Sequence, residues 1–175
     1  HPHQLSGGQR QRIVVARSLL LNPRLIVADE PVSMIDASLR ANVLETLRAL
    51  RDDQGISILY ITHDLATARQ VSDRILVLYR GRVVESGPAT AVIGSPRHPY
   101  TQLLIASVPR PDPDQSWSAE IAAAQAADSR DRSACVFLGR CPHRVDACAD
   151  QPAATKVARD HQVSCHLVAG DRALS

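Results

Sequence analysis

Leu25-Ile26-Val27-Ala28-Asp29-Glu30-Pro31 is a short, unbroken apolar run that ends in two acidic residues and a proline. A run of this length and character is typical of a strand buried in a parallel sheet. The proline ends the strand, so the two carboxylates lie at the carboxyl edge of the sheet, where open α/β sheets bind ligands. The alternative interpretation is a strand followed by a solvated acidic turn.

Helical and strand patterns alternate on both sides of this run, from His1 to about Val108. The expected elements are helices over 10–21, 39–50 and 64–71 and strands over 25–28, 56–61, 74–79 and 82–85. Arg80-Gly81 separates the last two strands and indicates a hairpin. Strands that alternate with helices predict an α/β fold in which helices cover both faces of a parallel sheet.

The composition of the 175 residues fits a folded chain, with 45% apolar and 22% charged residues. A net charge of only +2 gives no support for a nucleic-acid partner. Only five residues are aromatic, so we expect an aliphatic core. Apolar runs fall far short of the ~20 residues that span a bilayer. Because the chain begins at His1 and its single methionine is Met34, we expect a fragment whose upstream part is missing.

The character of the sequence changes after Val108. Prolines at 109, 111 and 113 begin a stiff, polar segment, and an alanine-rich stretch follows it. The cysteine-bearing tail beyond is too short to build a hydrophobic core of its own. A segment of that size usually needs a cross-link, such as disulfides or a bound metal, to fold. The predicted organisation is therefore a domain over 1–108, a linker over 109–132 and a four-cysteine extension over 133–175.

Leu5-Ser6-Gly7-Gly8-Gln9 stands directly before the first predicted helix. Its glycines let the backbone approach a ligand closely, and Ser6 supplies both a hydroxyl and a helix cap. The unpaired N–H groups of a first helical turn form a receptor for phosphate. A polar turn that only caps the helix is the alternative.

The acidic pair and one histidine suit phosphoryl chemistry. Asp29 would hold Mg²⁺ through water, and Glu30 would orient and deprotonate the water that attacks a γ-phosphate. His63, in Thr62-His63-Asp64 after the second predicted strand, could contact that phosphate. For His63 taken alone, the alternative is a structural or surface histidine.

The order and spacing of these motifs, with Ser33-Met34-Ile35-Asp36 between them, resemble the ATP-binding cassette (ABC) ATPases over residues 1–108. The matching motifs are the family's signature, Walker B strand, D-loop and switch histidine. The resemblance implies that Asp29 serves Mg²⁺, Glu30 is the catalytic base, Asp36 couples two sites and His63 is the switch. It also implies which residues bind the γ-phosphate of ATP held by a partner subunit: Ser6, Gly7, Gly8 and Gln9.

One part of the family pattern does not occur here. The Walker A loop requires G-x-x-x-x-G-K-[ST], and the single lysine, Lys156, has no nearby glycine pair. We therefore expect the fragment alone not to hydrolyse ATP.

The segment Arg97-His98-Pro99-Tyr100-Thr101-Gln102-Leu103-Leu104 resembles the C-terminal extension of oligopeptide/dipeptide ABC importers, and so do the cysteines that follow. The resemblance implies a [4Fe–4S] cluster at these four cysteines: Cys135, Cys141, Cys148 and Cys165. From the residues alone, four thiolates suit an iron–sulfur cluster or zinc, and their wide spacing favours the bulkier cluster. Histidines 143, 161 and 166 could substitute as ligands, and four free cysteines remain the alternative.

The resemblance implies a transporter subunit at the cytoplasmic face of the inner membrane, bound peripherally. Two such subunits, identical or paralogous, would sandwich ATP and drive two transmembrane permease subunits, with an extracytoplasmic solute-binding protein as an indirect partner. The solute would be an oligopeptide, a dipeptide or a similar small molecule. The alternatives are a nickel or oligosaccharide importer of the same type, an ABC ATPase without transport, and a metal-binding module with a vestigial ATPase part.

Overall fold

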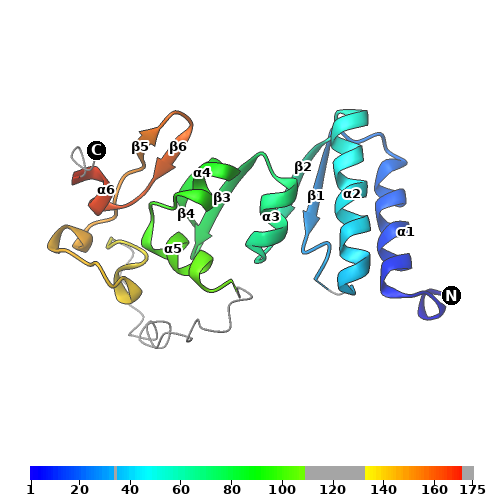
Figure 1. Cartoon of the computed structure of the whole chain (residues 1–175), viewed down its shortest axis with the longest axis horizontal. Coiled ribbons are helices and arrows are strands. Elements are labelled where there is room, and N and C mark those ends of the chain that lie inside the picture. Colours follow the sequence, from blue (N-terminus) through cyan, green and yellow to red (C-terminus); the bar gives the residue numbers. More distant parts are fainter. Residues whose placement is uncertain (34, 109–132, 171–175) are drawn as a thin grey trace. The chain divides into compact units, whose positions relative to one another are not determined.

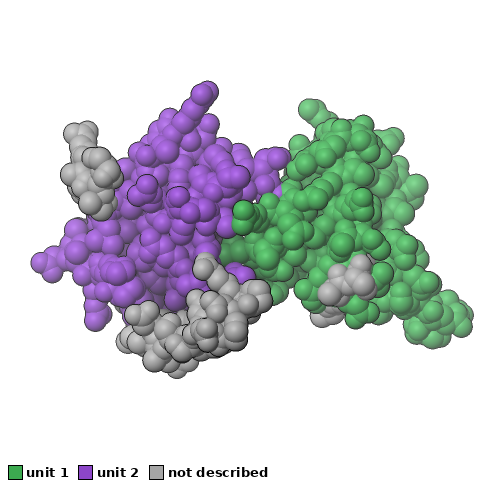
Figure 2. Space-filling view, viewed as in Figure 1, with its two compact units in different colours: residues 1–71 green, residues 72–175 purple. Residues whose placement is uncertain are grey.

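The computed structural model describes residues 1–33, 35–108 and 133–170. They form two compact units, residues 1–71 and 72–175 (Figure 2). The boundary between the units falls at Val71/Ser72, whereas the sequence places its divisions at 108 and 132. The predicted linker over 109–132 lies outside the described residues, and the three-part organisation stays a prediction.

The first unit contains a parallel strand pair with helices packed against it (Figure 1). Strands β1 (Leu25–Asp29) and β2 (Ser57–Ile61) pair in register from Leu25↔Ser57 to Asp29↔Ile61. The helical elements are η1 (Pro2–Gln4), α1 (Gly7–Leu19), α2 (Ala37–Gln54) and α3 (Leu65–Val71). The core gathers Val32, Ile35, Val43, Leu44 and Leu47, with Leu39, Ile58, Tyr60 and Val71 packed around it.

The two faces of the parallel pair differ. Ile58 and Tyr60 pack against the helical core, whereas the side chains of Leu25, Val27 and Leu59 are 49–59% exposed. Strand side chains alternate between faces, which accounts for the difference. The prediction of a sheet covered on both faces therefore does not hold among the described residues, although the α/β fold with a parallel sheet and helices is confirmed.

The second unit contains an antiparallel sheet in the order β3-β4-β6-β5. Its strands are β3 (Arg74–Tyr79), β4 (Arg82–Pro88), β5 (Thr155–Ala158) and β6 (His161–Val163). Arg80 and Gly81 both have positive φ, 50° and 76°, as a tight two-residue hairpin turn requires. The predicted hairpin is confirmed, and because a two-residue turn joins antiparallel neighbours, β3 and β4 pair antiparallel with each other.

The cysteine-bearing segment adds to this sheet instead of folding by itself. Its strands β5 and β6 continue the sheet from β4, with Glu85↔Val163 and Ser86↔Gln162 as paired residues. The remaining elements in the described residues of this unit are α4 (Ala89–Gly94), α5 (Pro99–Ala106), η3 (Leu138–Arg140), η4 (Asp146–Ala149) and α6 (His166–Gly170). Sequence reasoning found no strands after residue 133.

An aromatic cluster joins the segment to the hairpin. The Phe137 side chain is 1% exposed, and its ring centroid lies 5.2 Å from that of Tyr79 and 5.5 Å from that of Tyr100. The expectation of a purely aliphatic core is therefore wrong for this unit, because three of the five aromatic residues meet at one point. Among the described helices, none is long and apolar enough to cross a membrane.

Candidate functional site

Glu30 and His63 meet at the carboxyl ends of β1 and β2. The parallel register places the residues after Asp29 and Ile61 side by side, and the Glu30 N–H donates to the Ile61 carbonyl at 2.9 Å. His63 Nδ1 then lies 2.6 Å from Glu30 Oε1. The two residues stand 33 positions apart in the sequence, and only the strand pairing brings them together.

The Glu30 backbone is held in an uncommon conformation. Its φ of 46° lies in the left-handed region, which costs about 1–2 kcal/mol for a residue with a side chain. The Glu30 carbonyl accepts hydrogen bonds from the N–H and the hydroxyl of Ser33, at 3.2 and 2.9 Å. Strain of this kind collects at functional sites, where surrounding contacts hold the residue in place.

The Glu30 carboxylate raises the pKa of His63 above its ordinary value, first through the hydrogen bond and then through its charge. Both side chains remain accessible, with His63 80% and Glu30 36% exposed. The pair therefore presents a carboxylate and a readily protonated imidazole to solvent at the sheet edge.

We expect Glu30→Gln to lower the pKa of His63 toward its ordinary value, because it removes the main acceptor charge. Since the folded-state pKa is raised, the stabilisation from this pair is complete below the unfolded-state pKa and is lost as the pH rises through the folded-state pKa. A histidine-specific NMR titration measures the effect. Asp64→Asn is the control and should shift the pKa less, because the charge of Asp64 contributes less than that of Glu30. An unchanged His63 titration in Glu30→Gln would contradict the interpretation.

Asp29 closes β1 at the same edge, and its side chain is exposed. Within the described residues, no group of three or more His, Cys, Asp or Glu side chains is placed to hold a metal ion. A single carboxylate nevertheless suits Mg²⁺, which keeps several of its waters and takes further oxygens from phosphates.

Ser6 caps α1. Its Oγ accepts the Gln9 N–H at 3.3 Å, and Gln9 Oε1 accepts the Ser6 N–H at 2.9 Å, which together form a capping box. The helix therefore begins at Gly7, three residues before the predicted start at Arg10. The cap uses Ser6 Oγ as an acceptor, so its hydroxyl proton can still be donated to a ligand.

Gly8 has a packing role that the sequence did not reveal. A Cβ at this position would lie 3.0 Å from Leu39 Cδ1 on α2. The small residue thus lets α1 approach α2, whereas the sequence suggested only room for a ligand.

Asp36 caps the start of α2 through its backbone carbonyl only. Its carbonyl accepts the N–H groups of Leu39 and Arg40 at 2.9 and 3.1 Å, while its exposed side chain makes no capping hydrogen bond. The carboxylate is therefore available for other contacts. Within the described part of the chain, no hydrogen bond joins Asp36 or Ser6 to Glu30 or His63.

The four cysteines are free thiols in one region of the second unit. Cys135, Cys148 and Cys165 are buried and Cys141 is partly buried. Burial raises the pKa of Cys135, Cys141 and Cys165, and the charges of neighbouring cysteines raise it further. The Cys135 N–H donates to the Cys148 carbonyl at 3.0 Å. The thiols thus lie near enough to interact, but among the described residues no three Cys, His, Asp or Glu side chains are placed to hold a metal ion.

Two of the histidines considered as substitute ligands have other partners. His166 Nε2 lies 2.9 Å from the Asp150 carbonyl, and His161 Nε2 lies 2.8 Å from Glu85 Oε1. Glu85 was not singled out in the sequence. The available signal was a lone acidic residue within an apolar strand, Val83-Val84-Glu85, next to a hairpin turn.

Comparisons with known families match both parts of the chain. A model described as "ABC transporter" matches residues 1–33, and one described as "Oligopeptide/dipeptide transporter, C-terminal region" matches residues 84–148. A solved ATP-binding cassette of an ABC transporter, MJ1267 in its ADP conformation, is 26% identical and aligns with a TM-score of 0.51 over 59% of this chain and 41% of that one.

Curated relatives match along nearly all of the chain. A protein of Brucella abortus (strain 2308) named as a peptide import ATP-binding protein is 46% identical over 95% of this chain and 49% of its own length. A similarly named protein of Brucella ovis is 42% identical over 94% of this chain and 53% of its own length. The chain thus spans about half the length of the curated relatives it matches.

Proposed function

This chain belongs to the ATP-binding proteins of ABC transporters, in their oligopeptide/dipeptide branch, and from this premise we propose that the protein containing it hydrolyses ATP to power the import of peptides or similar small solutes. The observation that carries the proposal is the 2.6 Å contact between Glu30 and His63 at the sheet edge. It joins a carboxylate able to accept a proton to an imidazole able to face phosphate oxygens.

The proposed reaction is an in-line attack of water on the γ-phosphorus of ATP. The water oxygen forms the new P–O bond, the bond to the leaving ADP oxygen breaks, and the water proton passes to the Glu30 carboxylate. Held by Glu30, His63 directs its other ring nitrogen away from the carboxylate, where it can donate to the γ-phosphate. Mg²⁺ held by Asp29 through water would neutralise phosphate charge when bound.

A second copy or a paralogue would supply the other half of each site. The Ser6 hydroxyl and the side-chain amide nitrogen of Gln9 lie at the positive end of the α1 dipole, so Ser6, Gly7, Gly8 and Gln9 would bind the γ-phosphate of the partner subunit's ATP. The uncommitted carboxylate of Asp36 would then couple the two sites. This arrangement places one subunit's phosphate receptor opposite the other subunit's base.

We place the protein peripherally at the cytoplasmic face of the inner membrane, on two permease subunits that receive solute from an extracytoplasmic binding protein. The names of the relatives support a peptide solute. Uptake of a labelled peptide into proteoliposomes that contain the complete transporter tests the proposal. Uptake should require hydrolysable ATP and should stop with a non-hydrolysable analogue, and ATP-independent uptake would refute it.

The four cysteines form a second proposed site, for a [4Fe–4S] cluster. The donor types support this proposal, since the four thiols are mostly buried and Cys141 interacts with the other three. We expect about four irons and four sulfides per chain after anaerobic purification of the complete protein. Cys165→Ser should lower this content, whereas Ser164→Ala should leave it unchanged. One equivalent of zinc with no sulfide would establish a zinc site and refute the cluster.

A further inference from the structure

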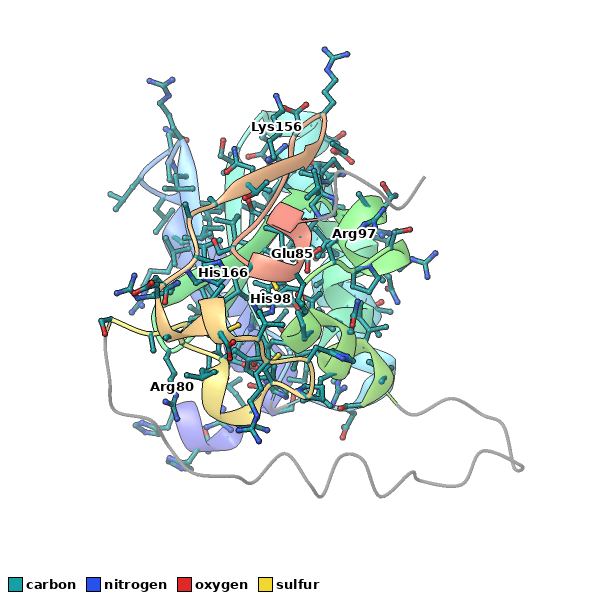
Figure 3. All side chains as sticks on the ribbon, turned by 90° about the vertical axis from the view of Figure 1, so that its left-hand side faces the viewer. Arg80, Glu85, Arg97, His98, Lys156 and His166 are labelled. Atoms are coloured by element: carbon teal, nitrogen blue, oxygen red, sulfur yellow. The ribbon has the colours of Figure 1, made fainter. Side chains whose placement is uncertain are left out.

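Glu85 is a fully buried carboxylate on β4 that contacts two other segments of the second unit, residues 97–98 and His161. Its side chain has no exposed surface. Oε1 accepts the Arg97 N–H at 2.9 Å and lies 2.8 Å from His161 Nε2, and Oε2 accepts the His98 N–H at 2.9 Å. Figure 3 labels Glu85 between Arg97 and His98, whose amides bind its carboxylate. A buried carboxylate is tolerated only when donors satisfy it in this way.

The contact with His161 fixes the strand that leads to Cys165. His161 opens β6, which pairs with β4, and the Ser164 N–H continues the pairing by donating to the Val84 carbonyl at 2.8 Å. A Cβ at Gly87 would lie 3.1 Å from His161 Cδ2, so this glycine gives the imidazole room against β4. Cys165 is the next residue after Ser164 and is buried.

The contact with His98 fixes the segment that carries Cys135. Burial lowers the pKa of His98 to about 4, so the ring is neutral and its Nδ1 accepts the Tyr100 N–H at 3.0 Å. The His98 ring centroid lies 5.7 Å from that of Phe137. Phe137 follows Cys135 by two residues, and the Cys135 N–H binds the Cys148 carbonyl. The Glu85 carboxylate thus anchors β6, which leads to Cys165, and the His98 segment, on which the segment of Cys135 packs.

We propose that Glu85 is a positioning residue for the four-cysteine site: by binding His161 and the amides of Arg97 and His98, it holds together the two segments that present the cysteines. The two amides that bind Glu85 directly precede α5, which begins at Pro99, so the same contacts also hold the start of this helix. The inference rests on the proposed role of the cysteines as ligands. The accessibility of the thiols in metal-free protein tests it separately from metal binding.

The test compares Glu85→Ala and His161→Leu with Gln162→Ala in the complete protein. Gln162 is a matched control, because it lies on the same strand with an exposed side chain. The readout is the alkylation rate of each cysteine by N-ethylmaleimide in metal-free protein, measured by mass spectrometry. We expect alkylation of Cys165 and Cys135 to accelerate about tenfold or more in the first two variants, because a lost partner of a buried charged group favours local opening.

His161→Gln distinguishes a lost contact from a general defect in folding. A glutamine amide can donate to Glu85, so this variant should slow alkylation again relative to His161→Leu. Hydrogen exchange in residues 1–71 should be the same in all variants. Rates in His161→Leu within twofold of the wild type, or an equal acceleration in Gln162→Ala, would overturn the inference. If the expected rates occur in a protein that never binds iron, the positioning role stands and the cluster proposal fails.

Discussion

On the proposed function, Glu30→Gln will reduce ATP hydrolysis by the complete protein about 10²–10⁴-fold while leaving ATP binding intact. Glutamine has the shape of glutamate, and its carbonyl oxygen can still accept a hydrogen bond from His63 in place of the 2.6 Å contact. It cannot accept the proton of the attacking water. The loss should therefore appear in kcat, measured as phosphate release, with ATP retained on the protein.

Glu45→Gln is the matched control for this variant. Glu45 is exposed on α2, so the same chemical change there should leave kcat within about twofold of the wild type. A loss in Glu30→Gln smaller than tenfold would show that the proton goes elsewhere. Loss of ATP binding instead of turnover would also contradict the assignment, since it would make Glu30 a binding residue.

Phe137→Ala will lower the free energy of unfolding of the second unit by about 3–5 kcal/mol. The ring is 1% exposed and contacts Tyr79 on the hairpin and Tyr100 on α5, at centroid distances of 5.2 and 5.5 Å. Its removal leaves a cavity between the rings of Tyr79, Tyr100 and His98, which all contact Phe137. Chemical denaturation followed by circular dichroism and by tyrosine fluorescence measures the change.

The same experiment shows whether the cysteine-bearing segment depends on the hairpin. Because Phe137 joins them, we expect hydrogen exchange to increase in β3 and β4 as well as in residues 133–170. Val145→Ala is the control: Val145 lies in the same segment with 45% of its side chain exposed, so its loss should change stability by at most about 0.5 kcal/mol. Faster exchange confined to residues 133–170 would favour the separate extension that the sequence predicts.

The local sequence patterns were sufficient for most of the first unit. The sequence predicts strands over 25–28 and 56–61, and β1 and β2 follow them closely. The sequence predicts Glu30 at the carboxyl edge of the sheet and His63 after the next strand, whereas their contact depends on the parallel pairing of β1 with β2. The sequence predicts Ser6 as a cap, but the start of α1 at Gly7 also depends on the second hydrogen bond of the capping box, from the Ser6 N–H to the Gln9 side chain.

The second unit depended on contacts between distant residues. Sequence alone determined the hairpin at Arg80-Gly81 and the cysteine spacing, because both are local features. Only the tertiary structure revealed β6 on β4, Phe137 against Tyr79, and Glu85 bound to His161, 76 positions away. The physical reason is that hydrophobic periodicity reports which face of an element is buried, whereas the partner of a buried charge depends on how distant segments meet.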